Sequence, residues 1–150
     1  MSERPTVNQK LDAIAAEFAD LEPRERLQLL LEFAESLPPL PENLRQERDA
    51  GEHRVHECQT PVYIWVRVDD GRVEIAADVA PEAPTVKGFV AVLASAMSGS
   101  PPEEVLAMEP DAVQRLGLAD ALGMMRMRGL HAILHYIRAQ VRRAAASPAQ

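Results

Sequence analysis

Apolar residues recur at three- and four-residue spacing near both ends of the chain, which is the pattern of helices with one buried face. Near the start, Thr6 and Gln9 form a capping box ahead of one such stripe. A second stripe follows Glu22-Pro23 and is expected to end at the paired prolines 38–39, because proline cannot continue a helix. The C-terminal stripe comprises Leu130, Ile133, Leu134, Ile137 and Val141. We therefore expect amphipathic helices at both ends of the chain.

The centre of the chain has the two-residue alternation of β-strands. Residues 62–68 are rich in β-branched and aromatic side chains, and an Asp-Asp-Gly turn separates them from a second strand. We expect a hairpin near residues 61–77, then a helix with an apolar face from Val86, and a short helix opened by a second capping box at Ser100–Glu103. Helices, a hairpin and further helices, in this order, predict an α+β fold with a small antiparallel sheet.

Composition limits the class of protein. A chain of 150 residues, 47% hydrophobic and 26% charged, suffices for a single domain with its own core. No apolar run approaches the roughly 20 residues that a membrane helix needs, and no apolar segment of a signal peptide follows Met1. One cysteine cannot form an internal disulfide, which suits a reducing compartment. We therefore expect a cytoplasmic protein without membrane contact.

The net charge of −7 is unevenly distributed. Residues 121–150 contain five arginines and no acid, a charge of +5, which leaves −12 for the other 120 residues. A mostly acidic surface argues against nucleic-acid binding, because neutralising phosphates requires a basic surface. The basic C-terminal stretch is interpreted first as cations at a helix C-terminus, and second as a contact for an acidic patch on a partner.

Residues 38–57 are polar, contain prolines and predict a long connection, which in a compact domain is more often functional than accidental. Cys58, the only cysteine, ends this connection just before the first strand. That position predicts a loop tip, where functional residues collect, although free cysteines are commonly buried apolar residues.

Two other chemical interpretations of Cys58 are open. A zinc site with His53 and His56 lacks an evident fourth ligand, and an iron–sulfur cluster generally takes four cysteines. A cysteine hydrolase needs a histidine oriented onto the thiol, for which His131 and His135 are candidates. Residue patterns alone do not separate these alternatives.

Four short stretches, in matching order, resemble the SufE family of sulfur acceptors that serve iron–sulfur cluster assembly. They are Leu37–Pro41 closing the second helix, Glu57–Tyr63 around the cysteine, Val86–Phe89 at the start of the helix after the sheet, and Arg126–Leu130 at the start of the last helix. The resemblance implies that residues 1–150 form a single SufE/IscU-like domain, with its core at roughly 7–143 and a disordered tail at 144–150.

The match has departures near the cysteine. Glu57 stands where most of the family has glycine, which restricts the left-handed conformation of the loop. Met125 and Arg128 replace a serine and an asparagine of the family pattern. Met124, Met125 and Met127 are expected to fill gaps in the core or to line an apolar groove.

The resemblance implies a sulfur carrier. Cys58 would take persulfide sulfur from a SufS-like cysteine desulfurase, stimulate that enzyme, and relay the sulfur to a SufBCD-like iron–sulfur scaffold. Pyridoxal phosphate belongs to the desulfurase, so no cofactor or metal is expected in this chain, an accessory protein rather than an independent enzyme. Arg126 is implied to stabilise the thiolate or persulfide, and Glu57, Gln59 and Thr60 to shape the loop. The alternative is a non-catalytic interaction module that regulates a desulfurase or scaffold, with Cys58 structural.

Overall fold

The computed structural model describes residues 4–109 and 111–146. The described elements confirm the α+β class and the small antiparallel sheet. Along the chain they are helices α1 (Val7–Ala19), α2 (Pro23–Glu35) and α3 (Glu42–Asp49), strands β1 (Val62–Asp69) and β2 (Arg72–Val79), and helices α4 (Pro84–Met97), α5 (Pro102–Leu106), α6 (Ala112–Arg115), α7 (Ala119–Leu122) and α8 (Met124–Ala146).

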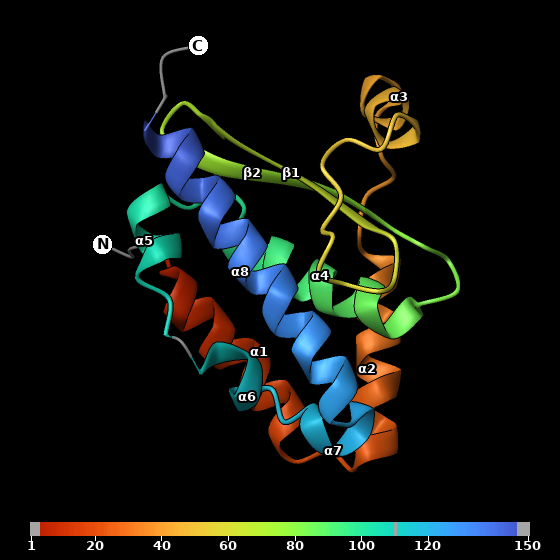
Figure 1. The fold of residues 1–150 in the computed structure, drawn as a ribbon. Coiled ribbons are helices and arrows are strands. Elements are labelled where there is room, and N and C mark those ends of the chain that lie inside the picture. Colours follow the sequence, from red (N-terminus) through yellow and green to blue (C-terminus); the bar gives the residue numbers. More distant parts are fainter. Residues whose placement is uncertain (1–3, 110, 147–150) are drawn as a thin grey trace.

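Helix α4 is the centre of the core and is buried along most of its length. It packs against α2, β2, α1 and α8, and Figure 1 shows α8 crossing α4 and rising toward the hairpin, which lies above α4. The contact with α2 is so close that a Cβ atom at Gly88 would lie 2.2 Å from the carbonyl oxygen of Leu30. Real Cβ atoms do not approach that closely, so only glycine fits there without a shift of the helices.

The hairpin extends slightly beyond the expected segment, to Val79. Its turn places Asp70 at φ 55° and Gly71 at φ 75°, as in the type I′ turns that match strand twist. One face pairs Val62 with Val79 and Ile64 with Ala77, and it turns its apolar side chains toward the core. The hairpin thus supplies a rigid edge immediately after the cysteine loop.

Two expectations about the first half of the chain are wrong in detail. Helix α2 ends at Glu35, before the paired prolines, and the Ser36 hydroxyl donates a 2.6 Å hydrogen bond to Phe33 O at its C-terminus. Leu37 precedes a proline, and that position disfavours the helical conformation. The 38–57 connection also contains α3, which buries no residue and therefore has no apolar stripe in the sequence.

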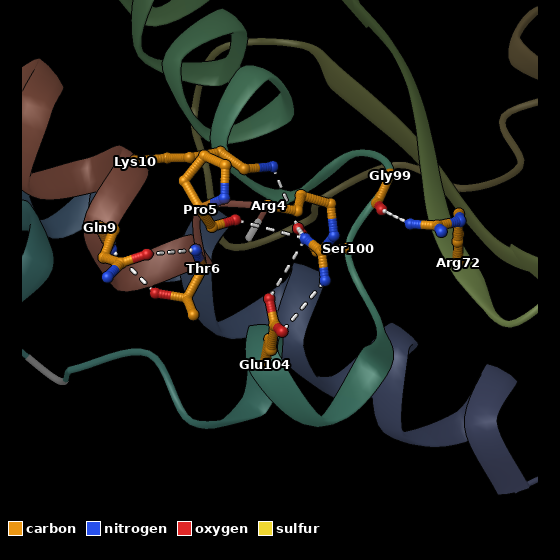
Figure 2. Close-up of polar contacts among 9 residues, drawn as sticks. All are labelled: Arg4, Pro5, Thr6, Gln9, Lys10, Arg72, Gly99, Ser100 and Glu104. Carbon is orange, nitrogen blue, oxygen red and sulfur yellow. Dashed lines mark hydrogen bonds and ion pairs between the residues drawn. The ribbon is translucent and has the colours of Figure 1, made fainter. Parts of the chain in front are cut away.

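The N-terminal segment is tied to the turn between α4 and α5 (Figure 2). The capping box of Thr6 and Gln9 is confirmed, with hydrogen bonds of 2.8 and 3.1 Å. The second capping box is wrong, because Pro101 occupies the N-cap of α5. The fully buried Ser100 hydroxyl instead accepts a 3.1 Å hydrogen bond from Lys10 Nζ. Burial, and the nearby charge of Arg4, lower the pKa of Lys10.

The C-terminal helix has the expected buried stripe, from Leu130 to Val141. It continues to Ala146, so residues 144–146 of the expected disordered tail are helical. Residues 147–150 of that tail lie outside the described part of the chain. Among the described helices, α8 included, none has the length and apolar character to cross a membrane.

Candidate functional site

Cys58 lies in the loop between α3 and β1, as the sequence predicts. A 2.8 Å hydrogen bond from Val55 N to Val62 O closes the base of this loop, and Cys58 N donates to Val55 O at 3.2 Å. Both valines are fully buried, so the loop folds down onto the core. The expectation of a loop tip outside the core is therefore wrong: Cys58, whose exposure the sequence leaves open, is 6% exposed and packs within the hydrophobic core.

A cavity of about 490 Å³ lies beside Cys58. The cysteine loop (residues 57–60), the start of α4 at Val86 and the first two turns of α8 line it. The α8 residues involved are Met125, Arg126, Arg128, Gly129 and Leu130. Three segments that resemble the SufE family thus converge on one cavity, although they are distant in the sequence.

Gly129 leaves space next to the cysteine sulfur. A Cβ atom at this position would lie 3.7 Å from Cys58 Sγ, which is an ordinary van der Waals contact. Glycine is the least favourable non-proline residue inside a helix, so its presence in the second turn of α8 costs stability. In exchange for this loss of stability, glycine leaves open space beside Cys58 Sγ. The sequence pattern alone does not single out Gly129.

The cavity wall carries both positive and negative side chains. Arg126 and Arg128 contribute guanidinium groups from α8, and Glu57 contributes a carboxylate from the loop. Arg126 Nη1 donates a 3.3 Å hydrogen bond to Thr85 Oγ1, which ties this side chain to the start of α4. The family resemblance implies a role for Arg126 in this region, whereas Arg128 stands out in the sequence only as a departure from the family pattern.

The three residues expected to shape the loop lie on the cavity wall. Glu57 and Gln59 are exposed and Thr60 is half-buried. The hydrogen bonds of the described residues include none from these three side chains, so backbone bonds and packing hold the loop. Glu57 is not among the described non-glycine residues at positive φ, so this loop conformation does not require the family's glycine. Their loop-shaping role stays a prediction.

The residues that line the cysteine cavity in the described structure include none of the four histidines. His53, in a left-handed conformation at φ 64°, stacks on Trp65 with ring centroids 5.4 Å apart. Donor atoms of His53, Glu47 and Glu52 lie within 4.8 Å of one another, so these residues could hold a metal. His131 and His135 line a separate groove. Of the described residues that line the cysteine cavity, none is a histidine, so neither the zinc site nor the hydrolase pair is assembled.

The methionines before the cavity divide into two groups. Met127 is 5% exposed and lies on the buried face of α8, as expected. Met124 and Met125 are each 75% exposed, so they do not fill the core, but Met125 lines the cysteine cavity, in line with the expected groove. They occupy the first turn of α8, where only Met127 continues the buried stripe toward Leu130. Two large apolar side chains therefore project at the edge of the cysteine cavity.

Comparisons with known proteins identify relatives over most of the chain. The family model of the SufE Fe–S metabolism associated domain matches residues 12–141. An uncharacterised SufE-like protein of Mycobacterium tuberculosis is 36% identical over 135 residues, covering 89% of this chain and 92% of the relative. The cysteine desulfuration protein SufE of Plasmodium vivax is 28% identical over 120 residues, covering 79% of this chain and 46% of that protein. The solution structure of a hypothetical protein from Thermus thermophilus matches with a TM-score of 0.75 at 37% identity, covering 95% of this chain and 99% of that one.

Proposed function

The chain belongs to the SufE family, and from this premise we propose that Cys58 accepts persulfide sulfur from a cysteine desulfurase and relays it to an iron–sulfur scaffold. Family membership supports a role in Fe–S metabolism and cysteine desulfuration. The observation that carries the finer proposal is the position of the only cysteine, beside a cavity with unfilled space next to its sulfur. The chain has no second thiol, so a persulfide on Cys58 waits for an external acceptor.

The transfer is an exchange at divalent sulfur, in the manner of thiol–disulfide exchange. The Cys58 thiolate attacks the outer sulfur of a persulfide on the desulfurase. A bond forms between Cys58 Sγ and that sulfur, while the bond from that sulfur to the donor cysteine breaks. The donor leaves as a thiolate, so the step needs no external oxidant or reductant. Relay to the scaffold repeats this exchange, with Cys58 as the leaving thiolate.

The cavity suits the extra sulfur atom. Gly129 leaves room beside Cys58 Sγ that a methyl group would fill. Arg126 and Arg128 place positive charge at the wall, where it can attract the terminal sulfur of a bound persulfide anion. We assign this role first to Arg126, because its hydrogen bond to Thr85 fixes its position. Glu57 acts against it where its carboxylate approaches the sulfur.

The burial of Cys58 sets a condition on the reaction. A cysteine that is only 6% exposed must become accessible before its sulfur meets a donor sulfur. The side chains of Glu57, Gln59 and Thr60 make no hydrogen bonds within the described residues, so moving the loop breaks few polar contacts. In this role the protein works in the cytoplasm as an accessory to the pyridoxal-phosphate desulfurase, binds no cofactor itself, and stimulates the enzyme by removing the sulfur that blocks its turnover.

The same burial favours one alternative, a non-catalytic module that regulates a desulfurase or scaffold, with Cys58 as a packing residue. The two functions differ in what a Cys58→Ser substitution does. Serine removes the sulfur and keeps the approximate size of the side chain, so a regulatory module would retain its effect.

The test is the intact mass of the protein after incubation with free cysteine and a desulfurase from the same organism, without reductant. We expect a gain of one sulfur atom on the wild-type chain that a small thiol removes, no gain on Cys58→Ser, and faster desulfurase turnover with the wild-type chain only. Absence of the gain, or equal stimulation by Cys58→Ser, would refute the carrier function.

A further inference from the structure

One face of α8 carries a row of three arginines and two histidines, of which the proposed sulfur chemistry uses only Arg128, the member nearest the cavity. Arg128, His131, His135, Arg138 and Arg142 follow one another at three- and four-residue spacing, so they lie on a single helix face. We call this row the α8 ridge. It extends over 15 residues, from Arg128 to Arg142, or about 21 Å at the rise of an α-helix. A groove of about 330 Å³ runs along its last four members.

The charges of the α8 ridge are not neutralised within the described structure. The ion pairs among the described residues involve Arg4, Arg45, Arg48, His53, Arg67 and Arg115, and none includes a cation of α8. Helix α8 itself contains no acidic residue. Arg138 donates a 2.9 Å hydrogen bond to the backbone oxygen of Leu106, so this member also ties α8 to α5. A positive strip therefore remains available on a protein whose other 120 residues sum to −12.

The α8 ridge is continuous with the cysteine cavity. Arg128 lines that cavity, and His131, three residues later on the same face, lines the groove. Met124 and Met125 stand exposed at the cavity end of the helix. An apolar contact beside the reacting sulfur, bordered by charges that extend away from it, has the composition of a protein interface with its polar rim.

We propose that the α8 ridge is the docking surface for an acidic strip on the protein that delivers sulfur to Cys58. This inference rests on the proposed function, because it takes the sulfur donor as the occupant. Met124 and Met125 supply the apolar contact at the cavity, and the ridge guides and orients the donor. Complementary rim charges act mainly on the association rate and on its dependence on salt.

Charge distribution argues against a nucleic acid as the occupant. The positive strip is one helix face wide, and the remainder of the molecule is strongly acidic. A duplex is wider than this strip and would meet the surrounding negative surface, where phosphates are repelled. A short acidic protein segment can match the strip alone.

The experiment compares two charge reversals of the same size. Arg142→Glu alters the α8 ridge far from the cavity, and Arg24→Glu alters an exposed arginine on α2, with neither arginine in an ion pair of the described residues. The association rate with the immobilised desulfurase is measured by surface plasmon resonance at low and high salt. Loading of Cys58 is measured separately by intact mass, with the desulfurase or with inorganic polysulfide as donor. Polysulfide needs no docked protein.

We expect Arg142→Glu to lower the association rate about five- to tenfold at low salt and to flatten its salt dependence, while polysulfide loading stays at the wild-type rate. Arg24→Glu should change each value less than about twofold. Equal association of both variants with the desulfurase would overturn the ridge proposal, even if polysulfide loads Cys58. A wild-type dimer that Arg142→Glu dissociates, or duplex DNA binding that it abolishes, would also overturn it. If neither donor loads Cys58, the proposed function fails, and the association measurement still decides the ridge.

Discussion

Two glycines inside helices mark regions of this molecule with opposite requirements. At Gly88, in α4, an added Cβ atom would meet the Leu30 carbonyl oxygen at 2.2 Å. At Gly129, in α8, it would meet Cys58 Sγ at an ordinary 3.7 Å. The first glycine is required because two backbones touch. The second is not required by packing, so the gap beside the sulfur calls for a functional reason.

The comparison separates stability from function. Glycine costs about 0.8–1 kcal/mol relative to alanine inside a helix, and this holds for both positions. At the α2–α4 contact the cost permits close packing of the core. At the cysteine cavity nothing in the resting fold is gained, which is the expected signature of a site that accommodates a further atom. The predictions below test this difference, from the largest expected effect to the smallest.

Gly88→Ala is expected to destabilise the fold by about 2 kcal/mol, because the helices must separate to admit the methyl group. For a chain of this size the melting temperature should fall by about 4–8 °C. Urea denaturation, followed by the fluorescence of the single tryptophan, Trp65, measures the change. A Gly88→Ala variant as stable as wild type would show that packing against Leu30 does not require glycine at this position.

Arg126→Gln is expected to slow the loading of Cys58 about tenfold, which corresponds to roughly one charge-assisted hydrogen bond. The reason is the loss of a positive charge that its bond to Thr85 holds at the cavity wall. Single-turnover loading by inorganic polysulfide, which needs no docked protein, measures the rate by intact mass. Arg128→Gln is the matched control, since Arg128 also lines the cavity but has no such bond among the described residues, and should slow loading less. Equal effects would remove the special role of Arg126.

Gly129→Ala is expected to stabilise the fold by about 0.5–1 kcal/mol, because alanine restores helix propensity without a steric conflict. The same urea measurement applies, with Gly88→Ala as the partner variant. The same glycine-to-alanine substitution should therefore change the free energy of unfolding in opposite directions at the two positions. Destabilisation by Gly129→Ala would show that the gap beside Cys58 is smaller than the structure indicates.

Tyr136, on α8, should make the fold sensitive to alkaline pH. Burial raises the pKa of Tyr136, the charge of Arg143 opposes this, and that of Glu57 adds to it. Because the pKa is raised in the folded state, the neutral tyrosine contributes its full stabilisation below the ordinary tyrosine pKa of about 10. This stabilisation is lost as the pH rises through the pKa of the folded state. The urea midpoint of wild type should therefore fall relative to that of Tyr136→Phe above about pH 10. Parallel midpoints across this range would contradict the assignment.

The sequence predicts those elements in which the spacing of apolar side chains shows which face is buried. The hairpin and the stripe of α8 show the two periodicities directly, and both are present in the structure. Helix α3 was missed because it buries no residue. Ser100 was misassigned because a capping pattern does not reveal that Lys10, distant in the sequence, takes the hydroxyl. Such tertiary contacts override local signals.

The site was predictable only in part for the same reason. The resemblance placed Cys58 and Arg126 in separate motifs, and the structure brings both to one cavity. The burial of Cys58 depends on Val55 and Val62, whose pairing cannot be inferred from spacing. The gap at Gly129 lies between the backbone of α8 and the Cys58 side chain of the loop. It becomes visible only when α8 is placed against the loop.

We propose that the gap beside Cys58 holds the transferred sulfur. The most direct test is single-turnover loading of wild type and Gly129→Ala by inorganic polysulfide, with the mass of Cys58 followed over time. We predict that Gly129→Ala, although more stable, loads more slowly and loses its sulfur to a small thiol sooner. Loading and release at wild-type rates would contradict the claim and leave Gly129 without a role in sulfur transfer.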